Sequence, residues 1–267
     1  MLPSIRSLAL LGLAAAASAL PAAAAASAAA EEEGKIDLNR RGGDDKPKTP
    51  KYFHEPGGSL ARLHYDSRFF VDEVPYGEHT SVLRDLIRSY LEVLGELNGA
   101  ETWLAHGTLL GWWWNGSIMP WDYDLDVQVS NGTLSWMGEH LNGTEHNYTS
   151  VAYIDGTAFQ REKRYLLDVN PHHSEIDRGD GMNIIDARWI DMQNGMFVDI
   201  TGVREREPED RPGTWSCKNK HRYEARDLWP MRVTEFEGVR AKIPYSFQRI
   251  LSDEYGEKSL VAEEWQG

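Results

Sequence analysis

Cysteine is nearly absent from this chain of 267 residues. Cys217 stands alone, which excludes an internal disulfide, so packing and hydrogen bonds must hold the folded part together. We interpret the lone thiol as a small packed residue rather than a nucleophile. The lack of disulfides does not place the chain in the cytosol, because a secreted domain of this size can fold without them.

Positive charge is scarce as well. The 28 lysines and arginines are outnumbered by 42 aspartates and glutamates, which gives a formal net charge of -14. Nucleic-acid binding depends on basic side chains that neutralise phosphates, so this balance argues against a nucleic-acid partner. It does not exclude a small anionic ligand that a metal ion holds in a local pocket.

Long apolar segments are confined to the beginning of the sequence. Arg6 precedes an apolar stretch, residues 8–20, and an alanine-rich run that continues to Ala30. Residues 1–30 are typical of a secretory signal peptide, and the shortness of the apolar stretch favours cleavage. The alternative is an uncleaved signal anchor, which is the case in which we expect contact with a membrane. Both interpretations place the protein in the secretory pathway, in the lumen of the endoplasmic reticulum or Golgi or beyond it as a secreted protein.

Four N-glycosylation sequons agree with entry into the endoplasmic reticulum. The last three fall between residues 131 and 149, and this cluster predicts an exposed polar loop. The sequons begin at Asn115, Asn131, Asn142 and Asn147.

The remaining chain is predicted to be a linker followed by one domain. Residues 31–51 are polar and include GGDDKPKTP, which is typical of a flexible linker, and we expect the folded domain over residues 52–267. Apolar residues recur at helical spacing over residues 79–97. The mixture of helices and strands favours an α+β fold, a mixed β-sheet flanked by helices. Strands are expected at residues 102–105, 125–129, 164–170, 183–191 and 196–201, and further helices from residue 109 and over residues 246–254.

Three aspartates alternate along the chain at Asp122, Asp124 and Asp126. On an extended strand, side chains two residues apart point to the same face, so Asp124 and Asp126 are expected to project together. Two adjacent carboxylates repel unless a positive charge lies between them, and oxygen ligands favour Mg²⁺ or Mn²⁺. A bare pair of this kind is more often a solvated strand edge. The small-residue turn before it, Gly107-Thr108, shifts the balance toward a metal site.

A third carboxylate is expected from another strand. Asp199 has the apolar neighbours of a strand residue, and Asp186 and Asp191 are the rivals. If Asn194-Gly195 forms a two-residue hairpin turn, Ile190 pairs with Asp199. Asp186, Arg188 and Asp199 then share a face and Asp191 lies opposite, whereas a three-residue loop would shift the register and reverse this sorting. We prefer Asp199 as the ligand, with Asp186 or Arg188 in support.

Candidate substrate-binding residues surround this pattern. Gly107 permits close approach of the backbone to a phosphate, with Thr108 beside it. His106 suits a phosphate contact or a structural hydrogen bond equally well. Trp114 is one of several tryptophans whose rings suit a sugar or a base, although most are expected in the core. Lys218, in a cluster with Lys220 and Arg222, is a candidate for a diphosphate contact, although such clusters are usually solvated.

In these residues the sequence resembles the LicD family, which includes fukutin and fukutin-related protein, and it is most similar to the fungal LicD-type proteins of mannosylphosphate transfer. The resemblance runs from about residue 76 to residue 255. Trp114 is a departure, because bacterial and fukutin-related members commonly carry arginine there. The matching motifs are HGTLLG at 106–111, WNG at 114–116, IMPWDYDLD at 118–126, NIIDAR at 183–188, VDITG at 198–202, CKN at 217–219 and FEG at 236–238.

The resemblance implies a nucleotidyltransferase-type fold and metal-dependent transfer of a phospho-group from a nucleotide-linked donor to a sugar hydroxyl. For the fungal branch it implies GDP-mannose as the nucleotide-sugar donor and a mannan or other glycan as the acceptor. By position, Asp124, Asp126 and Asp199 match the metal-binding and catalytic acids of the family. Asp122 belongs to the same motif, as a metal ligand or as a base for the acceptor hydroxyl.

Two other functions stay open at this stage. Some members of the fungal branch are regarded as regulators of mannosylphosphorylation, so the chain is alternatively a non-catalytic accessory protein. The tryptophans together with the leader also suit a secreted glycan-binding module. The intact carboxylates favour the phosphotransferase over both.

Overall fold

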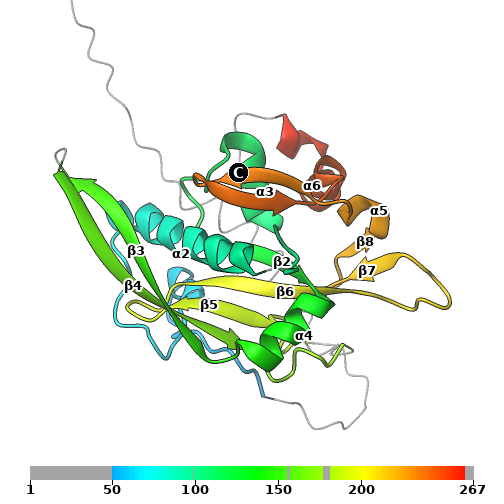
Figure 1. Ribbon diagram of the computed structural model, residues 1–267, viewed down its shortest axis with the longest axis horizontal. Helices are drawn as coiled ribbons and strands as arrows, with labels where there is room; N and C mark the ends of the chain where they lie inside the picture. Colours follow the sequence, from blue (N-terminus) through cyan, green and yellow to red (C-terminus); the bar gives the residue numbers. More distant parts are fainter. Residues whose placement is uncertain (1–49, 98, 155–156, 177–180, 262–267) are drawn as a thin grey trace, which may run out of the picture. The chain divides into compact units, whose positions relative to one another are not determined.

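The computed structural model describes residues 50–97, 99–154, 157–176 and 181–261, which lie within one compact unit (Figure 1). The predicted leader, residues 1–30, and nearly all of the predicted linker, residues 31–51, lie outside these residues. Among the helices in the described ranges, none has the length and apolar character needed to cross a membrane.

A mixed sheet of eight strands forms the centre of the structure, with the order β1-β2-β6-β5-β4-β3. In addition, β7 pairs with β6, and β8 pairs with β7. Only β2 and β6 pair in parallel among these strands, and the other pairs are antiparallel. The predicted α+β fold with a mixed sheet is therefore confirmed. The strands are β1 (Thr102–Leu104), β2 (Asp126–Ser130), β3 (Thr144–Ile154), β4 (Thr157–Val169), β5 (Ala187–Asp191), β6 (Phe197–Glu205), β7 (Thr214–Ser216) and β8 (Arg222–Glu224).

Helices and a separate hairpin surround this sheet. The long helix α2 crosses the sheet, and β3 and β4 extend beyond it as a long hairpin (Figure 1). The hairpin formed by β9 and β10 packs against α2 and β1. The elements are η1 (Ala61–His64), α2 (Tyr76–Glu96), α3 (His106–Asn115), α4 (Asn131–His140), α5 (Ala225–Leu228), β9 (Arg232–Phe236), β10 (Val239–Ile243), α6 (Phe247–Tyr255) and η2 (Glu257–Leu260).

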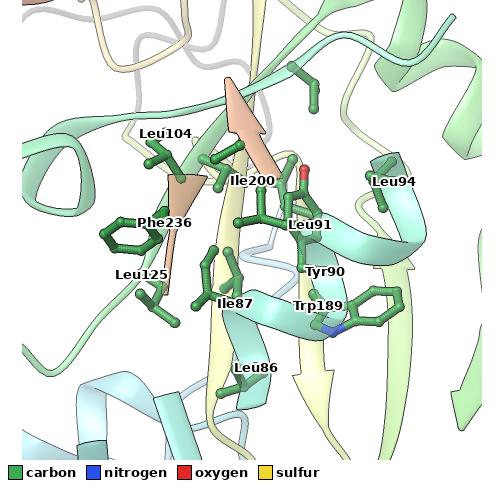
Figure 2. Close-up of a cluster of buried hydrophobic side chains, with 14 of the residues drawn as sticks. Leu86, Ile87, Tyr90, Leu91, Leu94, Leu104, Leu125, Trp189, Ile200 and Phe236 are labelled. Atoms are coloured by element: carbon green, nitrogen blue, oxygen red, sulfur yellow. The ribbon is translucent and has the colours of Figure 1, made fainter. Parts of the chain in front are cut away.

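The apolar face of the sheet is buried under α2. Apolar side chains recur along α2 every three or four residues, and they contact Trp189 of β5 and Ile200 of β6 (Figure 2). The indole N–H of Trp189 donates a hydrogen bond of 2.9 Å to the hydroxyl of Ser89, which satisfies its one polar atom inside this core. Because side chains alternate along a strand, the residues between these apolar positions point to the opposite face of the sheet. That second face carries the charged residues considered below.

The β5–β6 hairpin departs from the predicted register. Ile190 pairs with Phe197, not with Asp199, and four residues, 192–195, form the loop. The predicted two-residue turn is wrong because the buried carboxylate of Asp191 accepts 2.9 Å hydrogen bonds from the backbone N–H of Gln193 and the side-chain amide of Asn194, which together stabilise a wider loop. The shift is two residues, so Asp199 and Arg188 still share a face and are now direct partners.

The region of the three clustered sequons is a loop only in part, because Asn142 lies in the exposed turn of residues 141–143 and the other two lie in regular elements. Asn131 begins α4, and Asn147 lies within β3. The hydroxyl of Ser130 accepts a hydrogen bond of 3.3 Å from the backbone N–H of Thr133, so the polar stretch that suggested a loop is the N-cap of a helix. The expectation that Asp124 and Asp126 project together from one strand is wrong, because Asp122 and Asp124 precede β2, which begins only at Asp126.

Removing the carboxylate of Asp191 should destabilise the fold. Asp191 has no exposed side-chain surface and pairs with Lys163 at 2.9 Å, so Asp191→Ala leaves a buried ammonium without its partner and opens the 192–195 loop. Breaking such a pair costs about 3–5 kcal/mol. We expect urea unfolding to show a loss of this size, and the exposed Asp210→Ala to change stability little. Equal effects of the two substitutions would contradict this role for Asp191.

Candidate active site

The parallel pairing of β2 with β6 brings two aspartates side by side. Asp126 of β2 and Asp199 of β6 are register partners, and the backbone N–H of Asp199 donates a 2.8 Å hydrogen bond to the carbonyl of Leu125. Partners on adjacent strands point to the same face of a sheet. Since the neighbours Leu125 and Val127 are buried in the apolar core, both carboxylates project from the opposite, charged face.

Asp122 and Asp124 reach the same region from the segment that leads into β2. Burial, together with the negative charge of Asp124, raises the pKa of Asp122 to about 9. Burial is also the main cause that raises the pKa of Asp199, and the charge of Asp124 adds to it against the opposing effect of Arg188. Each of these shifts records carboxylates that are close together and poorly solvated.

Arg188 holds Asp199 in place. Its Nε donates a 2.8 Å hydrogen bond to Oδ1 of Asp199, and its NH2 group donates one of 2.8 Å to Glu55. The guanidinium also lies 3.6 Å from the ring centroid of Phe197 and 4.7 Å from that of Phe53. With 3% of its side chain exposed, Arg188 is a rigid, buried cation between two carboxylates. Sequence reasoning named Arg188 or Asp186 for this supporting role, and Arg188 is the one that contacts Asp199.

The turn at the start of α3 borders the aspartates. The hydroxyl of Thr108 accepts a 2.8 Å hydrogen bond from the backbone N–H of Asp126, which fastens the first turn of α3 to the first residue of β2. A Cβ atom on Gly107 would lie 3.4 Å from Oδ2 of Asp122, so this glycine directly adjoins that carboxylate. His106 begins the helix with a positive φ of 50°. The turn and the acids predicted from the sequence are thus brought together.

Two of the predicted substrate contacts lie in other surroundings. The indole N–H of Trp114 donates a 2.9 Å hydrogen bond to the carbonyl of Ser259 in η2. The ammonium of Lys218, 1% exposed, pairs with the fully buried Asp186 at 2.7 Å and donates to the carbonyl of His172. These partners account for both side chains structurally, and their contact with substrate stays a prediction. By contrast, Trp121, which is next to Asp122 in the sequence, is 49% exposed.

Sequence reasoning missed the C-terminal contribution to this region. Tyr255 ends α6, and burial together with the charges of Glu254 and Asp126 raises the pKa of its hydroxyl, which therefore keeps its proton beside the aspartates. Oε1 of Glu254 lies 2.5 Å from Nδ1 of His106, and the ring of His221 packs at a tilt of 44° against that of His106, with 4.4 Å between centroids. No local pattern indicates these contacts, because the three residues are far apart in sequence and only the fold joins them.

The carboxylate oxygens of the aspartates are suitable ligands for a hard divalent cation. Asp124, Asp126 and Asp199 offer carboxylate oxygens on a charged face, where the clustering of negative charge calls for a cation. Arg188 supplies one positive charge from the side of β5. Within the described residues, however, the three potential ligands whose atoms all lie within 4.8 Å of one another are His106, His221 and Glu254. The aspartate side chains would have to rotate inward to share one ion.

Comparisons with known proteins identify a family and several relatives of this chain. The model of the family described as LicD/FKTN/FKRP, nucleotidyltransferase domain, matches residues 99–246, more than half of the chain. Mannosyltransferase regulator 4 of Saccharomyces cerevisiae is 35% identical over 160 residues, which cover 57% of this chain and 13% of the yeast protein. Mannosyltransferase regulator 14 of the same yeast is 35% identical over 126 residues, 47% of this chain and 12% of that protein.

A more distant relative extends the comparison. The human ribitol 5-phosphate transferase FKRP is 27% identical over 177 residues, which cover 65% of this chain and 31% of the human protein. The chain therefore matches less than a third of the length of each of these relatives. The matched residues include the turn at 106–108, the aspartates of 122–126 and Asp199. This chain belongs to the LicD/FKTN/FKRP nucleotidyltransferase family.

Proposed function

We propose that this protein is a metal-dependent phosphotransferase that moves a phospho-sugar from a nucleotide-linked donor to a hydroxyl group of a glycan. The observation that carries the proposal is the side-by-side placement of Asp126 and Asp199 on parallel strands, with Asp124 close by and Arg188 behind. The family includes a relative named as a transferase of ribitol 5-phosphate, a reaction of the same chemical class. The leader predicted from the sequence suits action in the endoplasmic reticulum or Golgi lumen.

Asp124, Asp126 and Asp199 would hold Mg²⁺ or Mn²⁺ in this reaction. Such an ion would bind the phosphate groups of the donor and neutralise negative charge that develops during phosphoryl transfer. Arg188 keeps the carboxylate of Asp199 oriented toward its neighbour on β2. Gly107 and Thr108 place the first backbone N–H groups of α3 beside the aspartates, where a helix N-terminus favours a phosphate.

The expected reaction uses GDP-mannose and a mannan chain. The acceptor hydroxyl oxygen attacks the phosphorus that bears mannose, a new P–O bond forms, and the bond to the departing GMP breaks. A cation held by the neighbouring aspartates would lower the raised pKa of Asp122 and ionise it. Asp122, the acid nearest to Gly107 and the phosphate-facing turn, would then accept the hydroxyl proton. The exposed indole of Trp121 beside Asp122 is suited to stack on a sugar ring. The similarity to two yeast proteins of mannosyl transfer supports mannose as the transferred sugar.

A regulatory function is the second candidate. It is favoured by one observation: the two yeast relatives are named as regulators of a mannosyltransferase rather than as transferases. A purified protein that releases no GMP from GDP-mannose with Mn²⁺ and mannan, but stimulates a partner transferase, would support this alternative over catalysis.

Asp126→Asn should abolish transfer without unfolding the protein. The amide keeps the size of the side chain and the backbone hydrogen bond to Thr108, but it removes the negative charge that binds the cation. With Mn²⁺, GDP-mannose and mannan, we expect GMP release to fall by at least about 100-fold, the scale of losing one group that stabilises transition-state charge. The exposed Asp210→Asn is the matched control. Full activity of Asp126→Asn would refute the assignment.

Arg188→Lys should weaken the binding of the metal ion more than it affects folding. Lysine keeps the positive charge, but one ammonium cannot reproduce the paired contacts of Arg188 with Asp199 and Glu55. We expect the Mn²⁺ concentration that gives half-maximal GMP release to rise by about 10–100-fold, as for other groups that orient metal ligands. The exposed Arg240→Lys serves as control. An unchanged Mn²⁺ requirement would show that Arg188 does not position Asp199.

A further inference from the structure

Three potential metal ligands converge from segments that are distant in the sequence. His106 is the first residue of α3, His221 precedes β8, and Glu254 lies in the last turn of α6. One ligand atom from each lies within 4.8 Å of the other two. Oε1 of Glu254 is 2.5 Å from Nδ1 of His106 and 3.9 Å from Nε2 of His221.

We propose that His106, His221 and Glu254 bind a zinc ion at a site separate from the aspartates. Two imidazole nitrogens and one carboxylate oxygen form a donor set that suits Zn²⁺, whereas Mg²⁺ prefers oxygen ligands alone. Three protein ligands leave a fourth tetrahedral position open for water or another small ligand. The ligand atoms need to move only slightly to surround an ion, since zinc stands about 2.0–2.2 Å from nitrogen and oxygen.

Two of the three groups, Glu254 and His221, favour the forms that bind metal. Burial opposes ionisation of Glu254, but the hydrogen bond and charge of His106 outweigh it and lower the pKa of this carboxyl. Burial, followed by the charge of His106, lowers the pKa of His221, so its imidazole is neutral at neutral pH. The short contact between Nδ1 of His106 and Oε1 of Glu254 requires a shared proton, which Nδ1 donates when it is protonated. Zinc would replace that proton, which is released to solvent.

The second nitrogen of His221 is also held. Nδ1 of His221 lies 3.4 Å from the sulfur of Cys217, which is itself buried, so Nε2 is directed to Glu254. Histidines that bind metal almost always use the other ring nitrogen in a hydrogen bond that fixes the ring. This arrangement gives a structural role to the one cysteine of the chain.

An entry path is present beside the cluster. His221 and Glu254 line a cavity of about 420 Å³, together with Tyr223, Arg249 and Asp253. The cavity gives an ion access from solvent and leaves room for a fourth ligand. An ion bound here would fasten the start of α3 to the end of α6. Since Tyr255 follows Glu254 and its hydroxyl lies near the aspartates, zinc would steady that side of the proposed active site.

Zinc titration of the metal-free full chain by calorimetry tests the proposal. We expect one zinc ion, with affinity reduced by more than about tenfold in His221→Asn and in Glu254→Gln. His172→Asn is the matched control, because His172 pairs with Glu175 at 2.6 Å but is not part of a three-ligand group among the described residues. Asp126→Asn should bind zinc as the unchanged protein does.

Three results would overturn the zinc site: no binding by the unchanged protein, full binding by His221→Asn, or loss of binding in Asp126→Asn, which would place the ion on the aspartates. If His221→Asn fails to fold, the absorption spectrum of His221→Cys with bound Co²⁺ tests the site instead. Its thiolate should add a sulfur-to-cobalt charge-transfer band that the unchanged protein lacks, and absence of the band counts against the site. Because no donor or acceptor is present, these outcomes are independent of the transfer reaction.

Discussion

The parallel pairing of β2 with β6 is the constraint on which the other features of this structure depend. It sets Asp126 beside Asp199, and the alternation of side chains then directs Val127 and Ile200 into the core under α2. The apolar face fixes the register, because a slip of one residue would bury the carboxylates and expose the core residues. The same packing that stabilises the sheet therefore determines which acids meet on its charged face.

The concentration of negative charge on that face explains the other residues around it. Arg188 compensates part of it and is itself enclosed by Glu55 and two aromatic rings. Burial, with the charge of Asp124 added to it, raises the pKa of Asp122 and Asp199. A divalent cation, which also binds phosphates, would compensate the remaining negative charge of the aspartates. The histidine and glutamate cluster beside α3 has a different donor chemistry, which is why we assign it a different ion.

The sequence predicted those features that arise from local patterns. Periodicity located α2 and α6, alternation located β2, and the Asn194-Gly195 pair indicated the hairpin that contains β6. The α+β fold and the candidate aspartates were therefore predictable from the sequence. The register of the β5–β6 hairpin could not be predicted in this way, because its loop depends on the side chain of Asp191, which carries no turn signal of its own. His221 and Glu254 were missed for another reason. Their proximity to His106 arises only when β8 and α6 pack beside α3.

The central claim is that Asp124, Asp126 and Asp199 together bind the cation of a phosphotransferase. The most direct measurement is anomalous X-ray scattering from crystals of the protein grown with Mn²⁺ and a nucleotide diphosphate-sugar. The account predicts a manganese peak between the carboxylates of Asp126 and Asp199, on the face of the sheet opposite α2. Manganese bound elsewhere, with these carboxylates contacting only Arg188 and water, would contradict it.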